Sequence, residues 1–303
     1  MTGRVGSAGS RGRGAAAEAE RGFIIVAVLW ILGALATLAS VYSLYTSHTT
    51  LAARVNDDRL QSEALISAAL ELTAYQVTPA SAASRPTNGR FSLHMGRAVV
   101  DVAFVSEAGR IDLNAASKEE LSGLFATLGL RKDAADYDAE RVVGWRTRNQ
   151  EADQEEEAAA YRVAGLPYKP RRAPFDSTAE LWLVLGLSPI IVEHALPFVT
   201  VYSGSAELDM ANASPTAVAA QPGTTPERLQ GVLDKQAAAA APKPPPVAAP
   251  VAANAGNKTM RVTLRIAFDN GRQVRAEAVI LLIDNDEEPY HILSWHDDFD
   301  GPG

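Results

Sequence analysis

The side chains that catalyse most enzymatic reactions form no recognisable motif in this sequence. The chain has no cysteine, which excludes disulfides, thiolate zinc sites, iron–sulfur clusters and cysteine nucleophiles. No serine-nucleophile motif, phosphate-binding loop or dinucleotide fingerprint occurs. The run His296–Asp300 has metal-ligand chemistry, but a terminal tail is more often solvated. The five histidines show no metal spacing: His48, His94, His194, His291 and His296. The sequence therefore favours a non-enzymatic protein.

The N-terminus carries the pattern of a processing site. Residues 1–22 form a basic leader with four arginines and two glutamates, and the leader ends in Arg21-Gly22-Phe23. No charged side chain occurs from Phe23 to Ala53, and the first half of that stretch is nearly all apolar. A basic leader that ends in glycine directly before phenylalanine is typical of a class III, pilin-like signal, which is cut ahead of the apolar helix.

Two other interpretations of this apolar segment stay open. One is an uncleaved signal anchor, since about 20 apolar residues span a bilayer as a helix, with the basic flank predicting a cytoplasmic N-terminus. The other is a secretory signal cut at Ala34-Leu35-Ala36. The apolar run continues past that point, and no helix breaker intervenes between Gly33 and Pro79. Apolar residues recur at near-helical spacing afterwards, so we expect one helix from Phe23 to about Tyr75.

Alternating residues predict antiparallel strands on both sides of a long central segment. Phe91–Val105 has the pattern of a strand pair. Met260–Phe268 alternates apolar with polar side chains, and Val274–Leu282 returns after Asp269–Gly271, a turn that tolerates positive φ. Ile292–Trp295 is a candidate for a further strand. These patterns predict a small sheet with one buried face.

The central block over residues 113–200 shows helical signals instead. Ser117–Glu120 and Ser177–Glu180 have the spacing of capping boxes, in which the hydroxyl and the carboxylate satisfy free amides at a helix start. Each is followed by a short helix, a Leu-Gly-Leu turn and a second helix. A third related start, Leu208–Pro215, resembles Ile111–Ser117.

The predicted fold class is therefore α+β, with a long N-terminal helix packed on a small antiparallel sheet and a large all-helical domain inserted between strands. The expected segments are a leader over 1–22, the helix over 23–78, the first part of the sheet over 79–112, the inserted domain with helix-hairpin-helix-like repeats over 113–200, a return segment over 201–236, an Ala/Pro-rich linker over 237–257, and the C-terminal strands and tail over 258–303.

In this order, the segments resemble the GspK family, the large minor pseudopilins of type II secretion systems. The resemblance runs from Arg21 to about Ser294, interrupted by the Ala/Pro linker. It rests on several motifs in one order: Gly22-Phe23 with its apolar helix, Gly109–Asn114 with Ala116-Ser117, Tyr168–Pro170, Ala173–Ser177 with Glu180-Leu181, and Leu208–Ser214. It implies a pilin-like fold and a non-enzymatic subunit of the pseudopilus, the periplasmic fibre that serves protein export across the outer membrane.

The same resemblance implies how the chain is processed and with what it assembles. It implies cleavage by the prepilin peptidase between Gly22 and Phe23, and methylation of the new amine of Phe23. It implies a single-pass protein of the bacterial inner membrane with a cytoplasmic N-terminus and a periplasmic bulk. The implied partners are other minor pseudopilins in a tip complex and the major pseudopilin.

Ala27 bears on the place of the subunit in the fibre. It is the fifth residue counted from Phe23, where most pilins and pseudopilins have glutamate. That glutamate is thought to neutralise the terminal amine of the subunit above it inside the membrane, where an unpaired charge is expensive. A tip subunit has no neighbour above, and its helical block would obstruct one. Ala27 therefore fits a subunit that nucleates or caps the fibre; in an ordinary anchor helix it has no such meaning.

Membrane-helix packing is expected to bring the minor pseudopilins together. Apolar side chains would form the contact, and two small residues would allow close approach. The candidates are Ile24, Val28, Ile31 and Leu35, with Gly33 and Ala34 as the small residues.

Some members of the family bind calcium through acidic residues of the helical domain. In the corresponding stretch, Thr147 and Asn149 stand where aspartates are expected, and Asp153, Glu155 and Glu157 remain as candidate ligands. Calcium requires several converging oxygen ligands, whereas an acidic run is usually a solvated face. No other cofactor is implied.

A membrane-anchored helix-hairpin-helix DNA receptor is the alternative function. Such hairpins bind phosphates through turn amides, usually with a second glycine that Leu128–Leu130 and Leu185–Leu187 lack. The net charge of −8, from 28 Lys and Arg against 36 Asp and Glu, disfavours a phosphate backbone. We expect no nucleic acid partner.

Overall fold

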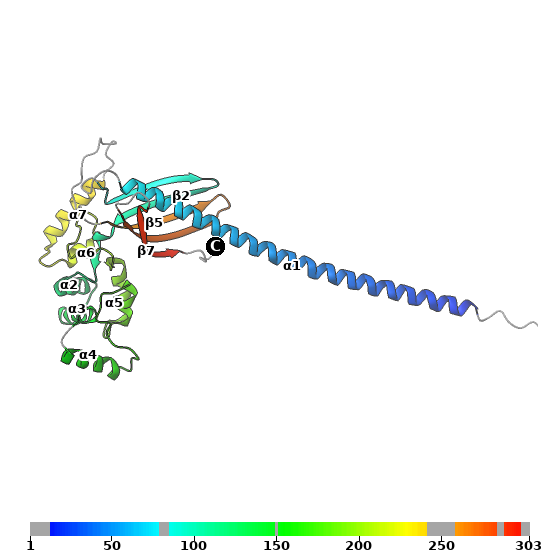
Figure 1. Ribbon diagram of the computed structural model, residues 1–303, viewed down its shortest axis with the longest axis horizontal. Coiled ribbons are helices and arrows are strands. Elements are labelled where there is room, and N and C mark those ends of the chain that lie inside the picture. The colour runs from blue at the N-terminus through cyan, green and yellow to red at the C-terminus, as the bar shows by residue number, and fades with distance from the viewer. Residues whose placement is uncertain (1–12, 79–84, 149–150, 241–257, 284–287, 298–303) are drawn as a thin grey trace, which may run out of the picture. The chain divides into compact units, whose positions relative to one another are not determined.

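The computed structural model describes residues 13–78, 85–148, 151–240, 258–283 and 288–297 (Figure 1). Side chains are not described at 13–24, 46–58, 151–154, 156 and 240. The chain divides into two units, residues 1–61 and 62–303, which are taken one at a time below.

The first unit is helical and contains most of α1 (Arg13–Val77). Its segment Ile25–Tyr45 is 21 residues long, and it is apolar enough to cross a membrane. Two hydroxyl side chains inside this segment bond to their own helix: the Thr37 hydroxyl donates to the Gly33 carbonyl at 2.7 Å, and the Ser40 hydroxyl donates to the Ala36 carbonyl at 2.9 Å. Their hydroxyl protons are thus satisfied without water, as a lipid environment demands.

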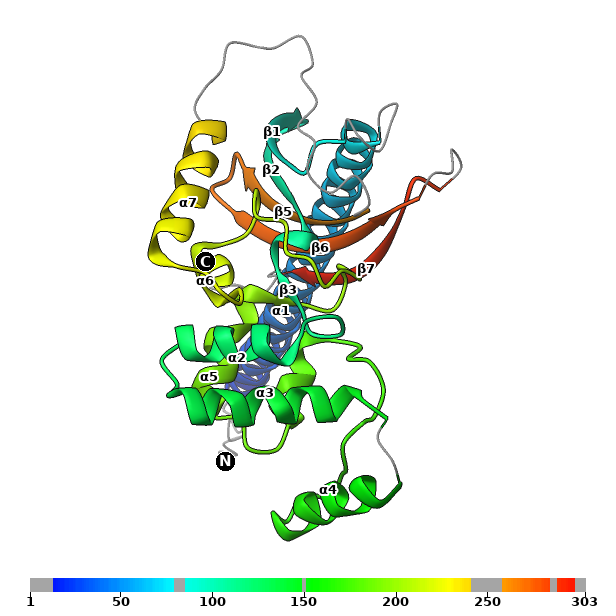
Figure 2. The same ribbon diagram turned by 90° about the vertical axis from the view of Figure 1, so that its left-hand side faces the viewer.

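In the second unit, the described residues form an antiparallel sheet of five strands in the order β1-β2-β5-β6-β7. Figure 2 shows these strands side by side, with the last turns of α1 against one face of the sheet. The strands are β1 (Asn88–Met95), β2 (Ala98–Ser106), β5 (Thr259–Phe268), β6 (Gln273–Leu282) and β7 (Tyr290–Asp297). The strand pair and the later hairpin expected from the alternation are both present.

The core of the sheet forms because one face of each strand is apolar. Every second residue of β2 from Ala98 to Ser106, and of β5 from Met260 to Phe268, is buried. These side chains pack against the last turns of α1, in which Ile66 and Leu70 are fully buried. Burying one such side chain contributes about 1.5–3 kcal/mol. The turn after β5 contains Gly271 at φ 86°, a conformation that favours glycine.

The helical block is inserted between β2 and β5, which are hydrogen-bonded neighbours. It contains the short parallel pair of β3 (Ile111–Asp112) and β4 (Val199–Thr200). Its helices are η2 (Glu107–Gly109), α2 (Lys118–Thr127), α3 (Lys132–Arg146), α4 (Glu151–Val163), η3 (Thr178–Leu183), α5 (Pro189–Ala195), η4 (Leu196–Phe198), α6 (Pro215–Ala220) and α7 (Pro226–Ala240). Among the described residues the block has a hydrophobic core of its own, separate from that of the sheet.

The second predicted capping box differs from the structure. Ser177 makes no side-chain cap bond, and the segment after it is the 3₁₀ helix η3. The Glu180 carboxylate accepts bonds from the Asp176 amide at 3.0 Å, from Arg171 at 2.6 Å and from the Trp145 indole at 3.1 Å. The start of the predicted Ala/Pro-rich linker is also different in the structure, because Ala237–Ala240 are helical and continue α7. The remainder of that linker lies outside the described residues.

Candidate functional site

Two turns with related sequences begin the helices at the centre of the block. The Asp112 carboxylate accepts bonds from the amides of Asn114, at 2.8 Å, and Gly204, at 2.7 Å. The Asp209 carboxylate accepts from the Ala211 amide at 3.0 Å and from the Asn212 side chain at 2.6 Å. Both aspartates are almost fully buried. In each case a bond from the amide two residues further on fixes the turn, as aspartate characteristically does.

Serine caps complete both turns. The Ser117 hydroxyl accepts from the Glu120 amide, and the Ser214 hydroxyl accepts from the Ala217 amide, each at 3.1 Å. Pro215 occupies the first turn of α6, where a missing N–H costs nothing. The predicted helix starts at Ser117 and Ser214 are thus confirmed.

The two capped helices, α2 and α6, pack closely against each other. A Cβ atom at Gly123 would overlap the carbonyl oxygen of Ala220, so a larger residue cannot fit there. The Glu120 carboxylate also accepts a bond from Gln221 on the far side of this contact. Burial raises the pKa of Glu120, and the bonds from Gln221 and the Ser117 backbone oppose that rise.

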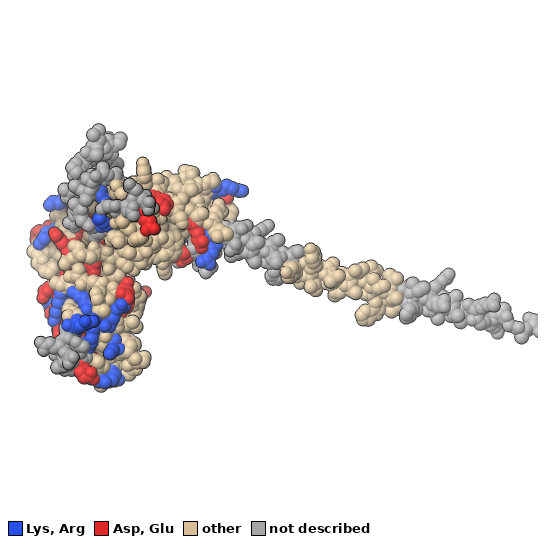
Figure 3. Space-filling model, in the orientation of Figure 1, with Lys and Arg blue, Asp and Glu red and all other residues tan. Residues whose placement is uncertain are grey.

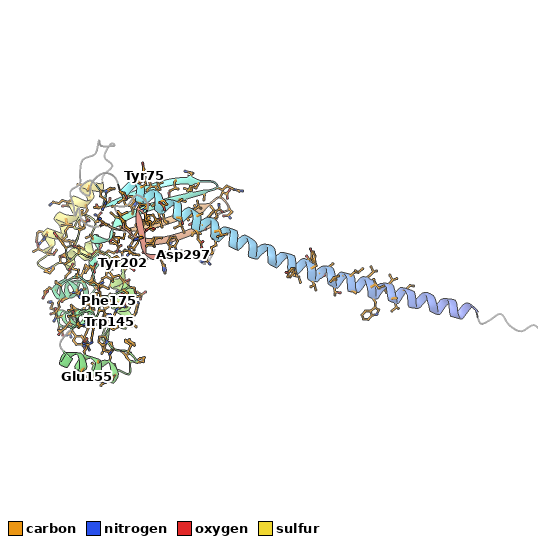
Figure 4. The ribbon with its side chains drawn as sticks, in the orientation of Figure 1. Tyr75, Trp145, Glu155, Phe175, Tyr202 and Asp297 are labelled. Carbon is orange, nitrogen blue, oxygen red and sulfur yellow. The ribbon has the colours of Figure 1, made fainter. Side chains whose placement is uncertain are left out.

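An aromatic cluster lies beside this pair. Figure 4 shows Trp145 and Phe175 next to each other, and their ring centroids are 6.2 Å apart. Tyr161 lies 6.3 Å from Trp145, and its hydroxyl accepts a bond from the Leu185 amide at 2.9 Å. Burial raises the pKa of Tyr161. This cluster joins α3, α4 and the turn after η3.

The motifs on which the sequence resemblance rests meet at this point. The Asn114 side chain donates to the Phe175 carbonyl at 3.0 Å and accepts from the Phe175 amide at 2.7 Å. The Arg146 guanidinium donates to the carbonyls of Leu113 and Ala116. Burial lowers the pKa of Arg146. The motif residues therefore act on the backbone of the block and have a structural role.

A buried ionic network links the block to the sheet. Glu107, with 0% exposure, follows β2 and accepts from the Arg261 guanidinium of β5 at 2.6 Å and from the Thr200 hydroxyl. Arg261 also pairs with Glu277 of β6. Burial lowers the pKa of Arg261, but the two glutamates outweigh this and raise it. This network was not predicted from the sequence. The one feature that could have indicated it is a charged residue, Glu107, between the apolar end of β2 and the motif at Gly109.

The predicted membrane contacts divide into two groups on α1. At 100° per residue, Val28, Ile31 and Leu35 share one side of the helix, and all three are exposed. Gly33 and Ala34 instead line a shallow groove, which Val26, Leu29, Trp30 and Thr37 complete. The two small residues and the three apolar residues therefore lie on different sides of the helix. Ala27 is half-buried in its helix. The side chains of Gly22, Phe23 and Ile24 lie outside the described residues.

Two of the three predicted calcium ligands, Glu155 and Glu157, face arginines. Glu155 pairs with Arg162 at 2.8 Å near the surface. Glu157 lies between Arg141 and Arg172, with an N–O distance of 3.8 Å to each. The Asp153 side chain is outside the described residues, as is the C-terminal tail beyond Asp297. In the part of the chain that is described, no group of three His, Asp or Glu side chains is placed to hold a metal ion.

Several basic side chains of the helical block that could meet a phosphate backbone are already bound within the protein. The local basic cluster consists of Arg141, Arg146, Arg148, Lys169, Arg171 and Arg172. Figure 3 shows Lys and Arg side chains over the helical block with Asp and Glu side chains among them. Arg146 is bound to backbone carbonyls, and Arg171 is bound to Asp176 and Glu180. The two Leu-Gly-Leu turns exist, with Gly129 and Gly186 at positive φ, but Gly186 is crowded by the Tyr137 ring. These contacts argue against a phosphate-binding role.

Residues 100–204 match the family model described as type II secretion system (T2SS), protein K. A chain from the crystal structure of the GspK–GspI–GspJ complex of the enterotoxigenic Escherichia coli type 2 secretion system has a similar fold. The TM-score is 0.52 at 13% identity, and the match covers 78% of this chain and 94% of that chain. No protein of curated function matches the sequence.

Proposed function

Because residues 100–204 match the protein K family model and the fold is similar to that of a chain in the GspK–GspI–GspJ complex, we propose that the chain is a minor pseudopilin of the GspK family, that it acts at the tip of the pseudopilus, and that it nucleates or caps the fibre. The observation that carries this proposal is the insertion of an entire helical block between the neighbouring strands β2 and β5. A second subunit stacked above such a block would compete with it for space. The role is non-enzymatic: the chain supplies a shaped, rigid end to the fibre.

The N-terminal helix supports an assembly role in the inner membrane. Ile25–Tyr45 would cross the bilayer, with the basic leader in the cytoplasm and the sheet and helical block in the periplasm. In our proposal the prepilin peptidase cuts between Gly22 and Phe23, and the new amine of Phe23 is methylated. Ala27 then leaves the tip subunit without the membrane carboxylate that a neighbour above would need.

The two sides of α1 fit two neighbouring helices. The apolar side with Val28, Ile31 and Leu35 would pack against one partner helix, and the groove at Gly33 and Ala34 would admit the close approach of another. The structural relative is part of a complex with GspI and GspJ. By analogy, the partners of this chain would be two other minor pseudopilins, with the major pseudopilin below them.

The proposal is tested in the native host by deletion and complementation. We expect the deletion strain to secrete less and to carry longer pseudopili than wild type, and the protein purified from membranes to begin at Phe23 with one added methyl group. Gly22→Val should leave the leader intact and fail to restore secretion. Gly14→Val changes a leader glycine away from the cut and should restore it fully. Normal secretion in the deletion strain, or an intact leader in wild type, would overturn the proposal.

A further inference from the structure

Glu157 lies at the contact between α3 and α4, where it is enclosed by two arginines. The side chains of Glu157, Arg141 and Arg172 are only 12%, 18% and 11% exposed. One guanidinium nitrogen of Arg141 is 3.8 Å from Oε1 of Glu157, and one of Arg172 is 3.8 Å from Oε2. Each carboxylate oxygen thus has its own cation. We refer to these three residues as the Arg–Glu–Arg cluster.

The backbone around the cluster is shaped to hold it. A Cβ atom at Gly144 of α3 would lie 2.9 Å from Oε1 of Glu157, so the absence of a side chain there makes room for the carboxylate. Arg172 has φ 57°, a left-handed conformation that is strained for a non-glycine residue. Its amide donates to the Trp145 carbonyl at 2.7 Å, which ties it to the end of α3. The guanidinium of Arg141 lies 5.4 Å from the centre of the Tyr137 ring.

The charges of the cluster are unfavourable for a divalent cation. Calcium takes six to eight oxygen ligands at about 2.3–2.6 Å. Here the Glu157 oxygens face guanidinium groups, and Glu155 pairs with Arg162 at the surface. Two arginines and one glutamate carry a net positive charge, which repels a further cation in a partly buried site. The described residues of this stretch therefore do not fit the calcium ion that the family resemblance led us to expect.

We propose that Arg141 and Arg172 supply the positive charge that calcium supplies to this stretch in other members, so that α4 packs onto α3 without a metal ion. The folding of the helical block is then independent of calcium. The cluster joins α3, α4 and the segment before η3, which also meet in the aromatic cluster of Trp145, Tyr161 and Phe175. This inference does not depend on the position of the subunit in the fibre.

Hydrogen exchange of the full chain in detergent micelles tests the proposal. Mass spectrometry measures the exchange of peptides from α3, from α4 and from the segment up to Arg172. We expect the same exchange in millimolar calcium, millimolar magnesium and EDTA. Slower exchange of these peptides in calcium alone would overturn the proposal, whatever the variants show.

Variants test the arginine–glutamate contact itself. Glu157→Gln should speed the exchange of α4 amides by about tenfold or more, because it leaves two partly buried guanidinium groups without their carboxylate. Glu155→Gln, a matched change at an exposed ion pair, should leave the exchange near wild type. Arg172→Lys keeps the charge and should retain most of the protection that Arg172→Met loses. If Glu157→Gln exchanged like wild type, or if Arg172→Met and Arg172→Lys behaved alike, the contact would not hold α4.

Discussion

The sheet and the helical block are stabilised by different kinds of interaction. The sheet and the last turns of α1 share an apolar core in which Val100, Leu264 and Ile280 are fully buried. The block also has an apolar core, but its turns are set by buried polar side chains such as Asp112 and Asp209. A periodic apolar face is visible in a sequence, whereas a side chain that bonds a distant backbone group is not. The two regions should therefore respond differently to mutation.

The largest effect is expected at the network that joins the two regions. Glu107→Ala leaves the Arg261 guanidinium partly buried and without its main carboxylate, and it removes the acceptor of the Thr200 hydroxyl. Loss of one partner from a buried ion pair costs about 3–5 kcal/mol. We expect a loss of that size in the free energy of unfolding, measured by urea titration of the full chain in detergent micelles. Glu277→Ala removes the more exposed partner of the same arginine and should cost clearly less; equal losses would contradict the role given to burial.

A core truncation in the sheet should come next. Leu264→Ala removes a fully buried side chain between the sheet and α1 and should cost about 2–4 kcal/mol. Hydrogen exchange should locate the loss in β2, β5 and β6, with the peptides of α2 and α3 almost unchanged. Faster exchange throughout the helical block would mean that the two cores unfold as one, against the separation described above.

A smaller effect separates the two serines that the sequence treats alike. Ser117→Ala removes the acceptor of the Glu120 amide and should cost about 1 kcal/mol, as helix caps usually do. Ser177→Ala removes no cap bond, and its cost should be roughly zero by the same reasoning. Urea midpoints of the two variants, measured side by side, make the comparison. A similar loss of stability in both variants would mean that Ser177 also caps a helix.

These two serines also show how far sequence reasoning reaches. The long helix, the strand pairs and the turn at Gly271 were predictable because each depends on local periodicity or turn chemistry. The box at Ser177 was wrong because Ser177 makes no side-chain cap bond and Glu180 bonds Arg171 and Trp145 besides the Asp176 amide, contacts that the Ser-x-x-Glu spacing does not show. The Glu107 network was missed for the same reason. The division of α1 into two sides, by contrast, follows from helical geometry alone and was open to prediction.

The smallest effect concerns the pH dependence of the helical block. Burial raises the pKa of Glu120 in the folded chain above its unfolded value of 4.5. Between these two pKa values the folded state binds more protons than the unfolded state, so this residue lowers stability as pH rises through that interval. Below it, the residue is protonated in both states and the penalty is absent. Above it, the penalty is fully present.

Glu120→Gln should remove this contribution, because the amide oxygen can still accept the bond from Gln221 but carries no charge. The stability of the variant relative to wild type should therefore increase from about pH 4 to about pH 7. Urea unfolding at both pH values measures it. Asp138, whose pKa is also raised by burial, is present in both proteins and cancels in the difference. If the stability difference between variant and wild type stayed constant or decreased with rising pH, the bonds from Gln221 and Ser117 would offset the cost of burying the Glu120 carboxylate. Polar contacts would then dominate the block even at this buried glutamate of α2.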